Sequence, residues 1–288
     1  MNRLWNTFRY TYAHLRGQIL GWGLGLAIYG LMIVPMYDSM AAQQDQLQQL
    51  IASYPPEFLA FFGGDATSLV TPAGYLGMYA FSMMPIIIGI FAVVVGSGLI
   101  VGDEERGRLD LIMAHPVGRS AFFFGRALGM LGAILSIMFL GWLGFSILLG
   151  GSSLGFTWGQ MAVPFLSLIT QVIVYATLAL SLSMFLPSRN LAAMVTSGVM
   201  VASYFVSSLA FMDERLATMS EFMPYHYFQT VLSFQDLNLT WLFTLLGASM
   251  LMIMVAWLRF ARRDIRLSGE GSWRLPLLPR RKKTAPVN

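Results

Sequence analysis

Few side chains in this sequence could act as a nucleophile, an acid or a metal ligand, and they stand in poor positions for catalysis. Residues 151–155 match the pattern Gly-x-Ser-x-Gly, but a nucleophilic serine of that kind needs a strand, a strained turn and a nearby histidine. The three histidines, His14, His115 and His226, lie far apart in the chain, and there is no cysteine. The sequence therefore predicts a plain loop at 151–155, no metal centre and no thiol chemistry.

Two further chemical hypotheses depend on acidic and basic residues. Glu104 and Glu105 could form the carboxylate pair of an intramembrane protease, but they lie in a charged segment and not in an apolar one. A phosphate-binding loop needs a Gly-Lys-Ser/Thr run, and the only lysines, Lys282 and Lys283, follow arginines. We therefore expect no enzyme activity, no cofactor on this chain and no ATP hydrolysis by the chain alone.

The elements that carry these residues are strongly apolar. Of 288 residues, 56% are hydrophobic and 11% are charged, whereas soluble domains carry roughly 25% charged residues. A helix needs roughly 20 apolar residues to cross a bilayer, and windows of that length recur along the chain. The sequence predicts an all-α integral membrane protein, a bundle of six transmembrane helices near residues 18–37, 79–101, 121–149, 160–186, 191–212 and 239–260.

The distribution of basic residues predicts the orientation of the bundle. Of the 18 Lys and Arg residues, all but Arg215 lie on one side of the predicted spans, and the loops after spans one and five are acidic. Because Lys and Arg gather on cytoplasmic loops, both termini are expected in the cytoplasm of a plasma, or bacterial inner, membrane. The positive charge of +4 then fits membrane lipid as a partner and not nucleic acid. Residues 1–266 form one membrane domain, and 267–288 a basic tail that we expect to be disordered.

Several local patterns predict how the helices pack. Residues 2–16 place Leu4, Trp5, Phe8, Tyr12 and Leu15 on one face, which is typical of an interfacial helix. Small residues recur every four positions at Gly17, Gly21 and Gly25, and again at Gly125, Gly129 and Ala133. Such stripes let helix backbones approach closely, either within the bundle or at a dimer seam. Pro85 and Pro164 are expected to kink their spans.

The centres of the six spans carry no ionisable residue, which argues against coupling to a proton or sodium gradient. Milder polar residues follow the fourth span. Two interpretations stay open for them: hydrogen bonds between helices, or a role for some of them in lining a pathway for substrate. The polar residues of this span are Ser167, Thr170, Gln171, Tyr175, Thr177 and Ser181, of which Thr170, Gln171 and Tyr175 are the candidates for the pathway.

The segment 102–119, GDEERGRLDLIMAHPVGR, follows the second span and is dense in both signs of charge. Asp103, Glu104 and Glu105 suit the first turn of a short helix whose apolar face would be Leu109, Ile112 and Met113, ended by Pro116 and Gly118. A short amphipathic helix can dock in a groove on a partner protein. Periodicity alone equally allows a solvated connector held by salt bridges.

This segment resembles the first cytoplasmic loop of the type-2 ABC-transporter permeases, which are the membrane subunits of ABC exporters. The positions that fit the motif of the family are Glu104, Glu105, Arg106, Gly107, Leu109, Asp110, Leu111, Pro116, Val117 and Arg119. Arg108 and Gly118 replace a threonine and a serine. The outer-loop run Pro224, Tyr225, His226 and Tyr227 also resembles a motif of the family, as do residues 54–64 and 71–76.

The resemblance implies a permease subunit that forms the translocation pathway, with ATP and magnesium held by a separate dimer of ATPase subunits and with a second permease as partner. It further implies that the segment contains a coupling helix that contacts the ATPase through Glu104, Glu105, Arg106, Arg108, Leu109, Asp110, Ile112 and Met113. Apolar spans without internal charge fit a lipophilic or amphipathic cargo. The alternatives are a mechanical or signalling subunit without a transported solute and, from another class, an intramembrane hydrolase.

Overall fold

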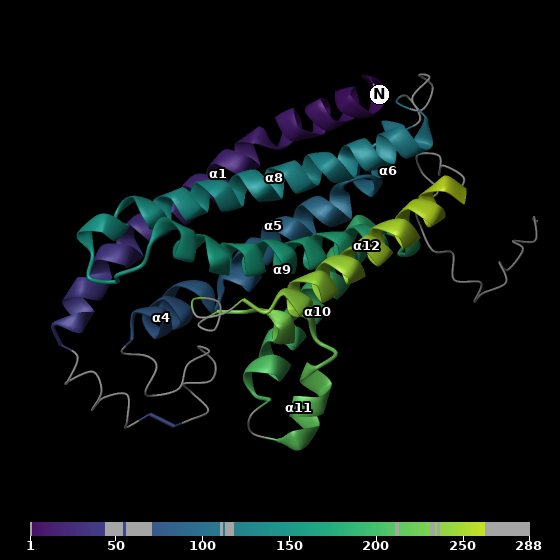
Figure 1. The fold of residues 1–288 in the computed structure, drawn as a ribbon. Helices are drawn as coiled ribbons and strands as arrows, with labels where there is room; N and C mark the ends of the chain where they lie inside the picture. Colours follow the sequence, from purple (N-terminus) through teal and green to yellow (C-terminus); the bar gives the residue numbers. More distant parts are fainter. Residues whose placement is uncertain are drawn as a thin grey trace, which may run out of the picture.

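The computed structural model describes residues 2–43, 54–55, 71–109, 112, 118–210, 213–230, 234 and 237–262. Every regular element in this part of the chain is a helix, and six of the helices are long and apolar enough to cross a membrane (Figure 1). The predicted all-helical class and the number of six spans are thus confirmed. The predicted basic tail at 267–288 lies outside the described residues.

Five of the spans are single helices close to the predicted windows. They are α1 (Asn2–Ala41), α8 (Arg119–Ile147), α9 (Trp158–Phe185), α10 (Arg189–Ser208) and α12 (Leu239–Arg262). A capping box starts α9, where the Thr157 side chain accepts from the backbone N–H of Gln160 and the Gln160 side chain accepts from that of Thr157. This reciprocal pair satisfies donors that the first helical turn leaves free.

The second span is interrupted. It consists of α4 (Pro72–Tyr75), the π-helix η1 (Leu76–Phe81) and α5 (Met84–Gly98). The two residues between η1 and α5 are Ser82 and Met83, so Pro85 lies in the first turn of α5 and not inside a helix. The prediction that Pro85 kinks the interior of a helix is therefore wrong. Proline has no N–H, and the N–H groups of a first helical turn have no acceptor within the helix, so Pro85 costs α5 no hydrogen bond. Pro164, in contrast, lies inside the continuous α9.

Helix α9 is the centre of the bundle, since it packs against α5, α8, α10 and α12. Helix α1 packs along α8 on the outside of this group, as Figure 1 shows for the purple and teal helices. The buried side chains that fill the space between the helices are mostly large and apolar. The largest fully buried ones include Tyr75, Tyr175, Phe81, Phe91 and Phe145.

Glycines of α8 bring α1 close to it. A Cβ at Gly129 would lie 2.7 Å from the Cβ of Thr11, and one at Gly144 would meet the backbone of Ala27. The prediction that the stripe around Gly125 and Gly129 permits a close helix approach is confirmed. The other stripe behaves differently, because a Cβ at Gly17, Gly21 or Gly25 would meet nothing within 4 Å. The stripe of Gly17, Gly21 and Gly25 therefore takes no part in packing among the described residues.

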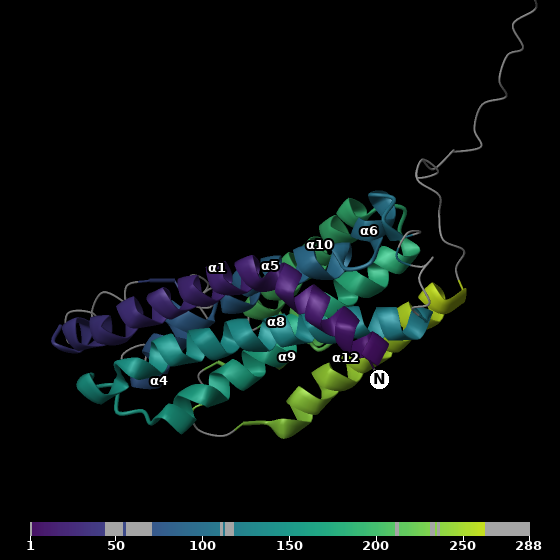
Figure 2. The same cartoon turned by 90° about the horizontal axis from the view of Figure 1, so that it is seen from above.

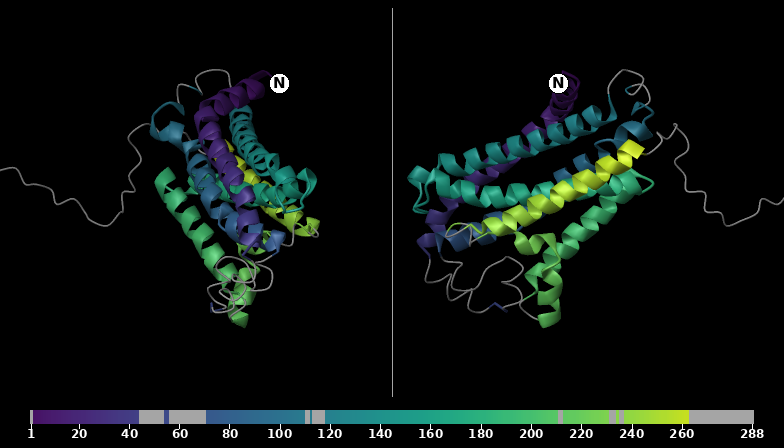
Figure 3. Two further views of the ribbon diagram at one scale, coloured as in Figure 1. Left: turned by 90° about the vertical axis from the view of Figure 1, so that its left-hand side faces the viewer. Right: turned by 45° about the vertical axis from the view of Figure 1, so that its right-hand side comes forward.

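Residues 2–16 are the first turns of α1 and not a separate helix. These turns bend away from the rest of α1 in the left view of Figure 3. Thr7 and Thr11 contact Gly125 and Gly129, while Trp5 is 55% exposed. The segment thus packs on α8 along one side, and its position at a membrane interface stays a prediction.

The two ends of the bundle carry different connections. One end holds the short helix α6 (Val101–Glu105), the start of α8 and the last turn of α12, where the Arg119 side chain donates to the Ala261 carbonyl (3.1 Å). We call it the α6 end, and Figure 2 shows that the N-terminus also lies there. The opposite end, the α11 end, holds η2 (Leu149–Gly151), α11 (Glu214–Ser220) and η3 (Pro224–Tyr227).

The close approach of α1 and α8 predicts a sharp response to one methyl group. Gly144→Ala should lower the free energy of unfolding by about 1–3 kcal/mol, because the new Cβ would overlap the backbone of Ala27, which cannot rotate away. Gly247→Ala is the matched control in α12, since a Cβ at Gly247 meets nothing within 4 Å. Thermal unfolding of both variants in detergent, followed by tryptophan fluorescence, compares them. Equal midpoints would contradict the helix contact.

Candidate functional site: the α6 segment and the outer loop

The charged segment after the second span folds as a short helix closed by a glycine. Helix α6 ends in a Schellman motif, in which the Gly107 N–H donates to the Glu104 carbonyl and the Arg108 N–H to the Asp103 carbonyl, both at 2.9 Å. Gly107 has φ of +65°, a conformation that glycine adopts without strain. The predicted helix is therefore divided: the acidic residues lie in α6, and the next helical turn begins only after Gly107.

Leu109, predicted to lie on an apolar face offered to a partner, is buried in the protein itself. Its side chain is 2% exposed and belongs to the hydrophobic core, and Ile112 packs against the same core while half-buried. The expectation of an exposed apolar face is thus wrong at Leu109, because the bundle covers the side chain. Asp110 and Met113, the other predicted coupling residues beyond Gly107, lie outside the described residues.

The residues that do face outward here are charged. Glu105, Arg106 and Arg108 are exposed, and Glu104 is half-buried. The Arg108 guanidinium lies 3.2 Å from the Asp103 carboxylate. This exposed face is therefore polar and of mixed charge, and it stands at the very end of the bundle.

A buried ion pair fastens α6 to α8. Asp103 and Arg126 are 9% and 6% exposed, and the Arg126 guanidinium donates to the Asp103 carboxylate. The guanidinium also lies over the rings of Phe122 (5.1 Å) and Tyr10 (5.6 Å), so it contacts α1 as well. A second link joins α6 to α10, where the Arg189 backbone N–H donates to the Glu105 carboxylate (2.9 Å). One short helix is thus attached directly to α8 and α10, and through Arg126 of α8 it is linked to α1.

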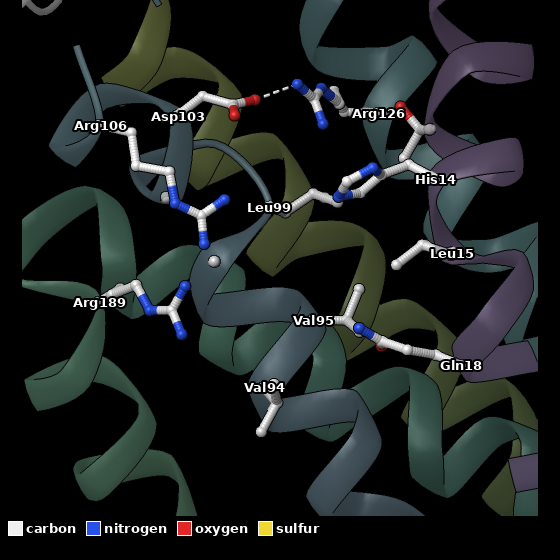
Figure 4. A pocket seen from close by; sticks show the side chains of 13 residues that line it. His14, Leu15, Gln18, Val94, Val95, Leu99, Asp103, Arg106, Arg126 and Arg189 are labelled. Carbon is white, nitrogen blue, oxygen red and sulfur yellow. Dashed lines mark hydrogen bonds and ion pairs between the residues drawn. The ribbon is translucent and has the colours of Figure 1, made fainter. Parts of the chain in front are cut away.

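Beside this ion pair lies a cavity of about 210 Å³. It is lined by α1, α5, α6, α8 and α10, and Figure 4 shows its side chains. Three arginines and one aspartate carry its charge, namely Arg106, Arg126, Arg189 and Asp103. The sequence analysis used Arg126 and Arg189 only to predict the orientation of the bundle in the membrane. The signal that could have singled out Arg126 is a charge among the apolar residues Phe122, Phe123 and Ala127.

The polar residues of α9 that were candidates for a pathway are all buried. Thr170 is 5% exposed, and Gln171 and Tyr175 are fully covered. Thr170 donates to the Ser167 carbonyl (2.7 Å) and the Gln171 amide to the Tyr175 hydroxyl (2.9 Å). In this conformation these side chains make hydrogen bonds inside the bundle. The Gln171 Oε1 atom has no hydrogen-bond partner among the described residues.

The outer-loop run Pro224, Tyr225, His226 and Tyr227 forms η3 and reaches into the same region. The Tyr225 backbone N–H donates to Ser203 of α10 (2.8 Å), and its hydroxyl donates to the Ser82 carbonyl at the break before α5 (2.7 Å). Burial raises the pKa of Tyr225 well above its usual range, so the phenol stays protonated. Tyr225 thereby ties the loop to two spans.

A second contact fixes the loop to α9. The Gln229 N–H donates to Ser167 (2.9 Å), and the Gln229 side chain exchanges two hydrogen bonds with the backbone of Asn238, just before α12. His226 lies to the outside, beside Ser220 (3.1 Å) and Trp241 (5.5 Å between ring centroids). The structure thus joins Ser167 of α9 to Gln229, just after the outer-loop motif, although the two residues are 62 positions apart.

The serine of the Gly-x-Ser-x-Gly pattern is Ser153, and it lies in a turn between η2 and α9. Its hydroxyl and its N–H both donate to the Asp38 carboxylate, at 2.5 and 2.8 Å. These two hydrogen bonds from Ser153 to Asp38 hold the turn against α1. The strand and the strained strand-to-helix turn of a nucleophile elbow are not found in the described residues around Ser153.

Together these features define a multi-pass helical membrane protein with a charged segment at one end and a hydrogen-bonded loop at the other. The sequence profile of the ABC-2 family transporter proteins matches residues 19–265, and the chain belongs to this family. A comparison with curated proteins finds no significant match. The resemblance seen in the α6 segment is confirmed by a match that covers all six spans.

The glycine that closes α6 gives a prediction for this segment. Gly107→Ala should destabilise the turn by about 1–2 kcal/mol, because an alanine is strained at φ of +65°. Gly118→Ala is the matched control, since Gly118 has φ of −62° and a Cβ there meets nothing within 4 Å. Hydrogen exchange of residues 101–112 reports local opening. We expect faster exchange in the Gly107 variant than in the Gly118 variant. Equal or slower exchange in the Gly107 variant would contradict the Schellman motif at the end of α6.

Proposed function

We propose that this chain is the permease subunit of an ATP-driven exporter and that the α6 segment couples it to separate ATPase subunits. The observation that carries the proposal is the attachment of this charged segment to α8 and α10, and through Arg126 to α1, in a chain of the ABC-2 family. A force applied to α6 would reach α8 and α10 directly and α1 through Arg126. Glu104, Glu105, Arg108 and Asp110 are the residues proposed to contact the ATPase, whereas the Arg106 side chain lines the cavity beside α6.

Leu109 and Ile112 have another part in this proposal. Because they pack into the bundle, they anchor the segment to the permease and do not supply the docking face. A polar residue in place of Leu109 would damage the permease itself, and so it could not test docking. The charged residues on the exposed side offer the cleaner test.

The α11 end supports a gate. The loop that contains η3 is bonded to α9 through Gln229 and Ser167, and to α10 and Ser82 through Tyr225. For a substrate to pass along Thr170, Gln171 and Tyr175, this loop would have to move away from α9. We propose that ATP binding to the partner subunits moves the spans between this conformation and one open at the α11 end, as in alternating two-state transport.

A second permease completes the proposed assembly. The open glycine stripe at Gly17, Gly21 and Gly25 shares α1 with exposed Leu20, Leu24 and Ile28. Apolar surface of this kind is covered by lipid or by another helix, and glycines favour a helix. ATP and magnesium would be bound by the ATPase, with none on this chain.

The orientation can be tested because the native chain has no cysteine. We propose that the α6 end faces the cytoplasm of a plasma membrane, as the basic residues indicate. A cysteine at Arg215 in α11 should then react with an impermeant maleimide in intact cells, whereas one at Arg108 should react only after permeabilisation. Rapid labelling at Arg108 in intact cells would reverse the topology.

The coupling role predicts a selective loss of partner binding. Arg108→Glu changes an exposed charge whose pairing with Asp103 contributes at most about 1 kcal/mol to stability. At a docking face, the reversal should weaken ATPase association by about tenfold or more, which is about 1.4 kcal/mol. Co-purification of the ATPase with tagged permease measures this. Arg215→Glu, at the α11 end, is the control, and equal ATPase recovery with both variants would remove α6 from the interface.

A further inference from the structure

The cavity beside the Asp103–Arg126 pair has an excess of positive charge. Among the described residues that line it, three arginines face a single carboxylate, and that carboxylate already pairs with Arg126 and Arg108. Figure 4 shows the guanidinium groups of Arg106 and Arg189 turned toward each other on one side of the cavity, with Arg126 on the other. Like charges held together repel, and an anion between them removes the repulsion.

Two details describe how the arginines are held. The Arg126 side chain is 6% exposed, and its Nε has no hydrogen-bond partner among the described residues, although a buried N–H normally has one. Gly98 leaves room for the Arg189 guanidinium, since a Cβ at Gly98 would lie 3.3 Å from its Nη1. Neither Arg106 nor Arg189 forms a salt bridge within the described part of the chain.

The lining changes from polar to apolar along the cavity. Leu15, Val94 and Val95 cover the part away from Arg106 and Arg126, with Gln18 beside them, while Leu99 lies between those two arginines. From Val94, a row of exposed apolar side chains continues along α5 toward the α11 end through Ile90, Ile87 and Met83. A ligand with a charged group and an apolar chain matches this order. A volume of about 210 Å³ is also below the roughly 300 Å³ of pockets for whole drug-sized ligands.

We propose that this cavity binds a phosphate group, and that its source is the headgroup of an anionic phospholipid in the leaflet at the α6 end. Arginine forks suit phosphate oxygens because they donate two parallel hydrogen bonds. Arg106 and Arg189 hold the phosphate, and the acyl chains lie along Val94 and Ile90. The site is independent of the exporter role, and it bridges α6 and α10 with a bound lipid.

The test uses the full-length chain in detergent and native mass spectrometry. Dioleoylphosphatidylglycerol is titrated against dioleoylphosphatidylcholine, whose choline cation the site should repel. We expect selective binding of the anionic lipid, weakened by about tenfold or more in Arg106→Gln/Arg189→Gln, because two charge-assisted contacts are lost. Arg106→Lys/Arg189→Lys keeps the charge and should retain part of the binding, which separates loss of the site from misfolding.

The matched control is Arg9→Gln/Arg16→Gln, which removes two exposed charges from the same end outside the cavity. Unchanged affinity in the Arg106/Arg189 variant, or an equal loss in the control, would overturn the site. Inorganic phosphate is the second probe. If it raises the thermal midpoint of the wild type but not that of the double Gln variant, while neither lipid is preferred, a soluble phosphate replaces the lipid and that part of the proposal is wrong.

Discussion

The buried ion pair between Asp103 and Arg126 is the contact on which the arrangement of the α6 end depends. Removing two charges from water costs several kcal/mol for each ion, and the attraction offsets this only with good geometry and further partners. Here Arg108 also faces Asp103, and the rings of Phe122 and Tyr10 face Arg126. Separating α6 from α8 would leave a buried charge without its partner, a change that typically costs about 3–5 kcal/mol. Movement of the segment apart from α8 is therefore costly, as the proposed coupling role requires.

The α11 end is held by weaker contacts. Tyr225 and Gln229 make neutral hydrogen bonds to Ser82, Ser203 and Ser167, and such bonds between membrane helices contribute about 0.6 kcal/mol each on average. They can be exchanged one at a time for bonds to water. One end of the molecule thus resists separation and the other can open at modest cost. The difference fits a protein in which a rigid link on one side moves a loop on the other.

The features that the sequence predicts are those set by the properties of residues that are close together in the chain. The six spans and the close packing at Gly125 and Gly129 depend on hydrophobicity and on the size of nearby residues, so they could be predicted. The exposed face at Leu109 could not, because helical periodicity shows that residues share a face but not whether that face turns to a partner or to the bundle. The break after Phe81 could not be predicted for a similar reason, since a π-helix such as η1, which ends at Phe81, has no simple sequence pattern.

The sequence by itself determined that this chain is a helical membrane protein with a charged segment after its second span, because bilayer thickness and the energy of burying charge act on every residue independently of its neighbours in space. Its motif was also enough to indicate the ABC-2 family. Only the tertiary structure decided that Arg126 meets Asp103, that Arg106 and Arg189 converge on one cavity, and that Tyr225 bonds to Ser203 of α10. These contacts join residues that are 22 or more positions apart. Which distant side chains meet depends on how whole helices pack, and that is set by the shape of the complete bundle.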